Sequence, residues 1–123
     1  MALSKLDQKV FPFFRAANMA GVSDVFSNFN YDLLTIEVSG SAMSVQATIQ
    51  GCINTVGPNK EPIDNANLEW SDLAVINTAD YSVSEKINSK GIFSIGISGL
   101  SKIRVVLNNI SGGVVNIIGV LEA

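Results

Sequence analysis

From Tyr31 onward, apolar and polar residues alternate with a period of two, in short runs separated by turn residues. The clearest run is 43–50, where apolar side chains hold the odd positions and Ser, Gln or Thr the even ones. A period of two predicts a strand with one buried face, whereas a helix would need a period near 3.6. Similar runs cover 34–39, 81–87, 93–98 and 103–108, and Leu73 to Ile76 is expected to be a further short strand. Val114 to Leu121 is apolar on both faces, which suits a strand covered on both sides.

Turn residues separate these runs. Gly40-Ser41 predicts a hairpin turn, Ser111-Gly112-Gly113 predicts another turn, and the Gly-, Pro- and Asn-rich segment 54–67 predicts a loop. The chain therefore has about seven to eight short strands and, after residue 30, no helix of ordinary length. This pattern predicts an all-β fold, either an antiparallel β-sandwich or a jelly-roll-like barrel.

Residues 1–30 have a different character. Helix-compatible stretches, Leu3 to Val10 and Arg15 to Met19, flank Pro12, which disfavours a continuous helix. We therefore expect an N-terminal arm with short helical turns over 1–30, followed by a sandwich domain over 31–123. The arm holds five of the six phenylalanines: Phe11, Phe13, Phe14, Phe26 and Phe29. These rings need a hydrophobic surface, which is either the protein's own sandwich or a neighbouring subunit, so they are the candidate assembly interface.

The charge pattern bears on partners. Charged residues make up 15% of the chain, against roughly a quarter in an average soluble domain. Either neutral polar groups keep the protein in solution, or other subunits cover part of its surface, and we favour a homo-oligomer. The net charge is −3 and the 8 Lys and Arg are scattered, which disfavours nucleic-acid binding. After Arg104 only Glu122 is charged, so this segment is either central in the sheet or covered by a partner.

The sequence shows no sign of a membrane span or of export. No stretch approaches the roughly 20 apolar residues of a membrane helix. The first residues lack the long apolar run and cleavage site of a signal peptide. We therefore expect the chain to be made and assembled in a cytoplasm.

The residue types argue against catalysis. Histidine, the commonest general base and metal ligand, is absent. Cys52 stands alone and is expected to be a small buried residue at a strand end. The carboxylates at Glu61, Asp64, Glu69 and Asp72 lack the spacing of a calcium loop and are expected to be solvated. We predict no catalytic residue, metal or cofactor, and no enzyme activity.

Two aromatic residues are candidate ligand contacts. Trp70 follows the long loop and Tyr81 opens a strand. Exposed rings of this kind can stack on sugars or anchor a protein interface, which would suit a host-surface glycan. The alternative, which we favour for Trp70, is a core or rim residue that closes one end of the sandwich.

Five consecutive pieces of the chain resemble a known module. They are 44–51 (SVQATIQG), 68–73 (LEWSDL), 87–93 (INSKGIF), 99–105 (GLSKIRV) and 111–116 (SGGVVN). From Leu33 to Val120 they resemble, in order and spacing, a small β-sandwich module of tailed-phage virion proteins. The chain departs from the module at 54–67, where its loop is longer than the module's short turn before the tryptophan.

The resemblance implies a place in a virion. The implied partners are other virion proteins, and the implied role is an accessory or decoration component, or a tail or baseplate module that binds host-surface carbohydrate or protein. Within the matched segments, we expect Gly91 and Gly99 at turns, Leu100 capping the core and Arg104 paired with a carboxylate such as Glu37 or Glu85.

Overall fold

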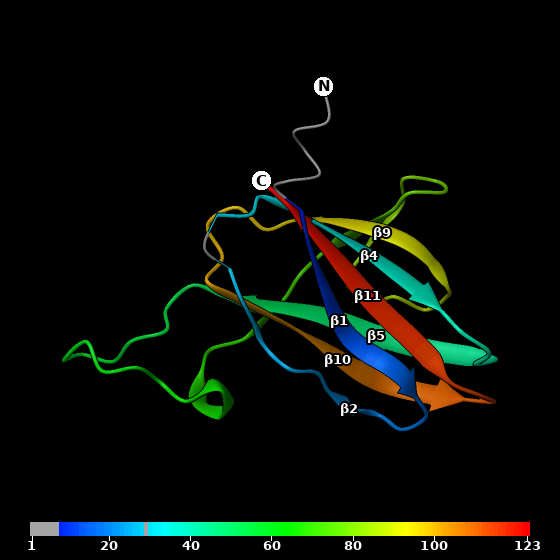
Figure 1. Cartoon of the computed structure of the whole chain (residues 1–123), viewed down its shortest axis with the longest axis horizontal. Helices are drawn as coiled ribbons and strands as arrows, with labels where there is room; N and C mark the ends of the chain where they lie inside the picture. Colours follow the sequence, from blue (N-terminus) through cyan, green and yellow to red (C-terminus); the bar gives the residue numbers. More distant parts are fainter. Residues whose placement is uncertain (1–7, 29) are drawn as a thin grey trace.

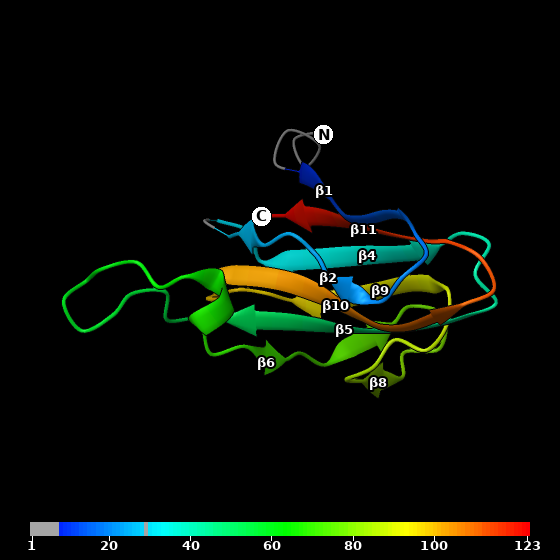
Figure 2. The same ribbon diagram turned by 90° about the horizontal axis from the view of Figure 1, so that it is seen from below.

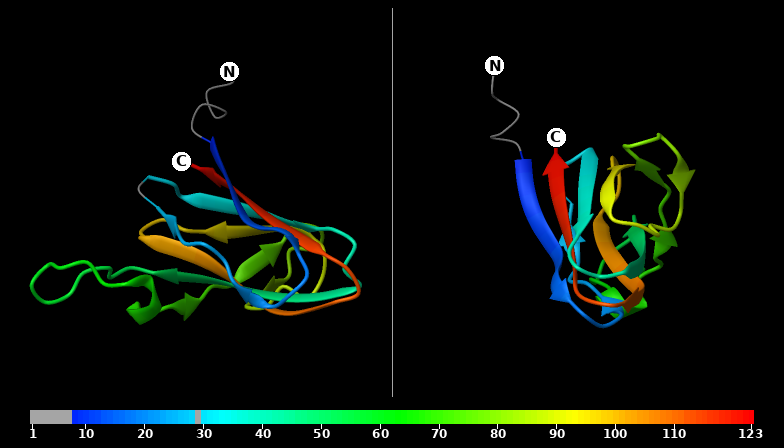
Figure 3. Two further views of the ribbon diagram at one scale, coloured as in Figure 1. Left: turned by 60° about the horizontal axis from the view of Figure 1, so that its bottom comes forward. Right: turned by 90° about the vertical axis from the view of Figure 1, so that its right-hand side faces the viewer.

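Alternating strands give the chain two antiparallel sheets packed face to face, in agreement with the all-β sandwich predicted from the sequence. The computed structural model describes residues 8–28 and 30–123. The six-stranded sheet has the order β1 (Gln8–Ala17), β11 (Val115–Glu122), β4 (Leu33–Ser39), β9 (Gly91–Gly96), β7 (Val75–Asn77) and β8 (Val83–Ser84). The five-stranded sheet has the order β2 (Gly21–Val22), β10 (Lys102–Ser111), β5 (Ser44–Cys52) and β6 (Ser71–Asp72), with β3 (Phe26–Ser27) also paired to β10. Figure 1 shows β1, β11, β4 and β9 side by side, and the end-on view in Figure 3 shows the two layers.

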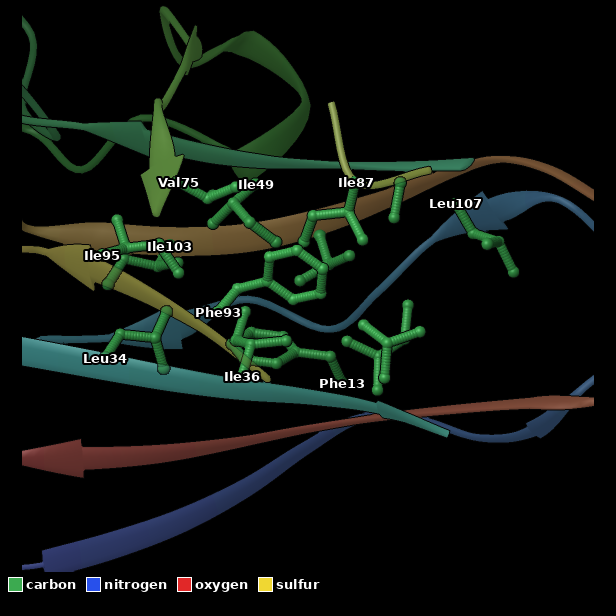
Figure 4. Close-up of a cluster of buried hydrophobic side chains, with 14 of the residues drawn as sticks. Phe13, Leu34, Ile36, Ile49, Val75, Ile87, Phe93, Ile95, Ile103 and Leu107 are labelled. Atoms are coloured by element: carbon green, nitrogen blue, oxygen red, sulfur yellow. The ribbon is translucent and has the colours of Figure 1, made fainter. Parts of the chain in front are cut away.

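The core lies between the sheets and comes from the residues that the period-two pattern marked as inward. Every second residue is buried along the whole of β4 and β11, and over 93–95 of β9 and 103–107 of β10, as in Ile36, Ile95 and Ile103. Figure 4 shows these side chains meeting across the two layers, with Phe93 and Ile49 among them. At about 25 cal/mol per Å² of buried apolar surface, this interlayer cluster is the main source of stability.

Two of the predicted turns carry the chain from one sheet to the other. Gly40-Ser41 joins β4 of the six-stranded sheet to β5 of the five-stranded sheet, so the predicted hairpin is wrong. Gly112-Gly113 likewise joins β10 to β11 across the layers. Gly40 has a φ of +118°, and a Cβ there would collide with the Val114 backbone, so glycine is required where the two crossings meet.

The N-terminal region departs most from expectation. Its described residues form β1, β2 and β3 and no helical turn, so the predicted helical turns are wrong over 8–28; Leu3 to Asp7 lie outside the described residues. β1 pairs along β11, while β2 and β3 pair with β10, so this segment joins both sheets of the sandwich. Pairing with the long neighbouring strand β11 outweighs the local helix propensity of residues 15–19.

The segment 54–67 is the predicted loop, but it is an ordered one. Thr55 O accepts the N–H of Ile63 at 2.9 Å, and Val56 forms a bridge with Pro62, which makes a short hairpin. A 3-10 helix, Asn65–Asn67, follows it. In Figures 1 and 2 this green segment extends away from the body of the sandwich.

Candidate interaction surfaces

The outer face of the six-stranded sheet carries an apolar surface. Strand register places six side chains in a row across all six strands, on the side away from the core: Val83, Ile76, Ser94, Thr35, Val120 and Val10. Pro12, Ile118, Glu37 and Ile92 form a second row, and Leu33 pairs with Glu122 on the other side of the first row. We call these residues the outer apolar face.

This face is exposed as well as apolar. Val83 is 65% exposed, Val10 57% and Ile92 45%. Two charged residues, Glu37 and Glu122, belong to the described rows, and both are acidic. A sheet face that meets only water usually carries polar side chains, and exposed apolar patches are frequent at protein interaction sites.

The outer face of the five-stranded sheet is built differently, because polar side chains there satisfy one another. Arg104 Nε donates to Gln50 Oε1 at 2.8 Å, and Gln50 Nε2 donates to Asp72 Oδ1 at 2.9 Å. Thr48 is 2% exposed; its hydroxyl donates to Asn108 Oδ1 at 2.8 Å and accepts from Lys86 Nζ at 3.0 Å. Because the polar groups on the outer face of the five-stranded sheet bond to one another, the outer face of the six-stranded sheet is the one better suited to a protein partner.

Trp70 belongs to this polar network. The indole N–H donates to the Asn65 carbonyl at 2.9 Å, and the Arg104 guanidinium carbon lies 4.3 Å from the ring centroid. The side chain is half-buried, as expected of a rim residue. One ring face and the polar edge are therefore engaged within the protein, which leaves less of Trp70 for a sugar than the sequence hypothesis required.

Arg104 does not make the expected ion pair. Glu37 lies on the outer face of the opposite sheet, and Glu85 follows β8, whereas Arg104 contacts Gln50 and Trp70. The expectation of a carboxylate partner for Arg104 is therefore wrong. The polar-face placement was right, but the choice of partner depended on strand order, which pairs β10 with β5.

Tyr81 and Trp70 lie in different connecting segments of the fold. Tyr81 sits in the turn between β7 and β8, with a φ of +61°, and is 80% exposed. Its N–H donates to Asn77 O at 2.7 Å, which fixes the turn. The two candidate aromatics thus belong to different sheets and form no common site.

The N-terminal phenylalanines are used inside the protein. Phe13 and Phe26 are each 5% exposed, and Phe11 and Phe14 pack against the core. Phe11 contacts both buried rings edge-on, at centroid distances of 4.8 Å and 5.2 Å. Of the two surfaces left open by the sequence, these four rings contact the protein's own sandwich. The phenylalanine assembly interface stays a prediction, and Phe29 lies outside the described residues.

A small hollow at the end of β5 is lined by Gly51, Cys52, Leu73 and Leu100, with Glu69 at its rim, and has a volume of about 300 Å³. Burial raises the pKa of the Cys52 thiol above its ordinary value, while the neighbouring Lys102 opposes that rise. A raised pKa keeps the sulfur protonated near neutral pH, so Cys52 is a packing residue and not an activated nucleophile.

Neither a metal-ligand cluster nor a helix able to span a membrane is found among the residues that the structure describes. Over 8–28 and 30–123, no three His, Cys, Asp or Glu side chains gather into a group that could hold a metal ion. The helical structure within the same residues includes nothing long and apolar enough to cross a membrane.

Comparison with known proteins shows the fold. The structure superimposes on the SPBc2 prophage-derived protein YomS with a TM-score of 0.77 and 21% sequence identity, over 95% of this chain and 94% of YomS. It superimposes equally well on the PBSX exported protein XepA, with a TM-score of 0.77 and 17% identity, over 94% of this chain and 38% of XepA. The chain shares the fold of both proteins. No protein-family model and no curated protein sequence matches it.

Proposed function

We propose that this protein is a non-enzymatic structural component of a bacteriophage virion, an accessory or decoration protein that assembles on the particle through its outer apolar face. One observation carries the proposal: the six-stranded sheet presents an exposed apolar surface, while the five-stranded sheet satisfies its polar groups internally. Burying such a surface against other subunits of a particle would stabilise assembly by about 25 cal/mol per Å².

Two further observations support this proposal. The fold is that of two proteins from prophages, YomS and XepA. The chain has no histidine, which removes the most common acid–base and nucleophile-activating group. The sequence resemblance to tailed-phage virion modules points to the same role.

The proposal is tested on particles purified by density gradient from the strain that carries the gene. Quantitative mass spectrometry is expected to find the chain in a fixed ratio to the major capsid or tail protein. Ile92→Asp places a charge in the outer apolar face and is expected to reduce incorporation about tenfold or more, because an unpaired charge at an interface is costly. Met19→Asp is the control, since Met19 is 74% exposed and lies between β1 and β2.

The two measurements test the virion role and the outer apolar face separately. Absence of the chain from purified particles would refute the virion role. Normal incorporation of the Ile92→Asp variant would show that a different surface makes the contact.

The second candidate function is a tail or baseplate module that binds host-surface carbohydrate or protein. The high exposure of Tyr81, in a turn fixed by hydrogen bonds, is the observation in its favour. Binding of the purified protein to host envelope preparations, lost in Tyr81→Ala and retained in Trp70→Phe, would support it. Equal binding by Tyr81→Ala and the wild type would exclude Tyr81 as the contact.

A further inference from the structure

We infer that the hairpin 55–63 of one copy docks in a hollow on the outer apolar face of a second copy, so that copies join head to tail. The inference rests on the proposed function, because it names a partner for that face. It follows from the residues that line the hollow, from the hydrogen-bonded backbone of the hairpin, and from the charged side chains of the hollow and the hairpin.

The hollow lies near the middle of the outer apolar face. Its lining is Thr35, Glu37, Ile92, Ile118 and Val120, and its volume is about 250 Å³. Ile118 and Ile92 flank Glu37 directly on the two neighbouring strands. An occupant of this hollow must therefore bring apolar side chains and a cation for the Glu37 carboxylate.

The hairpin supplies both in a preordered form. Val56 and Pro62 form a bridge and so project to one face of the hairpin, where Val56 is 45% exposed. Lys60 lies at the tip, exposed and held with a φ of +66°, and its N–H donates to Gly57 O at 2.9 Å. Because its backbone is ordered by its own hydrogen bonds, the hairpin would lose little conformational entropy on docking.

The neighbouring acidic residue of the hairpin has its carboxylate engaged by the hairpin backbone. Glu61 Oε2 accepts the Asn59 N–H at 2.9 Å, so its carboxylate is turned back into the hairpin. Lys60 is thus the cation that the tip presents, and Glu37 is the anion that the hollow presents.

Two other ways of joining copies are less favourable. Face-to-face packing of two outer apolar faces would bring Glu37 and Glu122 of both copies into one apolar interface, where paired carboxylates are costly. Strand addition at the open edge of β1 is hindered by Pro12, which has no N–H, and by register shifts on both sides of Phe14. A head-to-tail contact avoids both problems and generates a ring or a filament.

The test uses sedimentation velocity of the full-length protein over a wide concentration range, with circular dichroism to verify folding. The wild type is expected to associate reversibly. Lys60→Glu and Glu37→Lys should each weaken association about tenfold or more, because each creates a like-charge contact. The double variant Lys60→Glu/Glu37→Lys restores an opposite pair and should recover most of the association. Asp24→Lys, an exposed charge reversal between β2 and β3, is the control and should associate as the wild type does.

Recovery in the double variant, with both single variants impaired, would support the hairpin contact. A wild type that stays monomeric throughout, or a double variant as weak as the single ones, would overturn it. Neither of those results would remove the chain from purified particles, so the proposed virion role is judged separately.

Discussion

Phe13→Ala provides the sharpest test of the finding that the N-terminal segment belongs to the core. Phe13 is 5% exposed and contacts Phe11 edge-on at 4.8 Å. Its ring lies over Gly119 of β11, where a Cβ would come within 2.8 Å of Phe13 Cε2, so the absence of a side chain on β11 makes the space for the ring.

The expected cost follows from this packing. Removing the ring loses roughly 2 kcal/mol of apolar transfer free energy. The cavity left behind brings the usual total for a buried phenylalanine to about 3–5 kcal/mol. Because β1 is an edge strand and can relax toward the cavity, we expect a value near 3 kcal/mol, a large fraction of a typical domain's stability of about 5–15 kcal/mol.

Urea unfolding followed by circular dichroism measures this cost. The urea concentration at the midpoint should be lower for Phe13→Ala than for the wild type. The slope of the transition should be the same for both proteins, because a shift of the midpoint alone reports a change in stability. Val10→Ala is the matched control on the same strand, since Val10 is 57% exposed and should cost no more than about 0.5 kcal/mol. A loss below about 1 kcal/mol for Phe13→Ala would refute the assignment of β1 to the core.

Four further predictions concern other parts of the molecule. Arg104→Ala should destabilise the protein by about 1–2 kcal/mol in urea unfolding, because it removes the Gln50 hydrogen bond and the stacking on Trp70; an unchanged midpoint would contradict that. Cys52 should resist thiol reagents at pH 8 and react promptly in urea, and fast reaction of the native protein would contradict its burial. The pKa of Cys52 is higher in the folded state than in the unfolded state, so its contribution to stability is present below the unfolded pKa and is lost as pH rises through the folded pKa. Unfolding titrations should therefore show a lower free energy of unfolding above about pH 9. The decrease should be smaller in Cys52→Ala. Gly119→Ala should lower the unfolding midpoint, because its Cβ would crowd Phe13 and Leu34.

The sequence predicted what depends on local pattern. The two clearest period-two runs, 43–50 and 93–98, appear largely as β5 and β9, and Val45, Ala47 and Ile49 of the first point inward as expected. Met43, the first residue of that run, precedes β5 and is 87% exposed, so its predicted burial is wrong. Val114 to Leu121 was open to two explanations, and β11 is indeed central, between β1 and β4. Cys52 is the last residue of β5 and is buried, and Leu100 packs against the core, both as expected.

The sequence predictions that failed concern features that depend on pairing between strands distant in the sequence. A turn of two residues looks the same whether it closes a hairpin or crosses between sheets, so Gly40-Ser41 could not reveal the crossing. Residues 8–17 are apolar without a clean period, and only the partner β11 makes them a strand. The partner of Arg104 likewise required the strand order.

The outer apolar face could have been suspected from the sequence in part. Val114 to Leu121 is apolar on both faces, which is the signal of an outward Ile118 and Val120. Strand order was needed to place Ile76, Val83 and Val10 on the same surface. Because six strands contribute to the outer apolar face, the sequence of no single strand predicts it.

Cryo-electron microscopy of purified particles is the most direct test of the central claim. We expect β-sandwich density at repeated positions, with the outer apolar face, centred on Ile92, Ile118 and Glu37, buried against a neighbouring subunit. Density that instead shows this face open to solvent, or particles that contain no such sandwich, would contradict the claim.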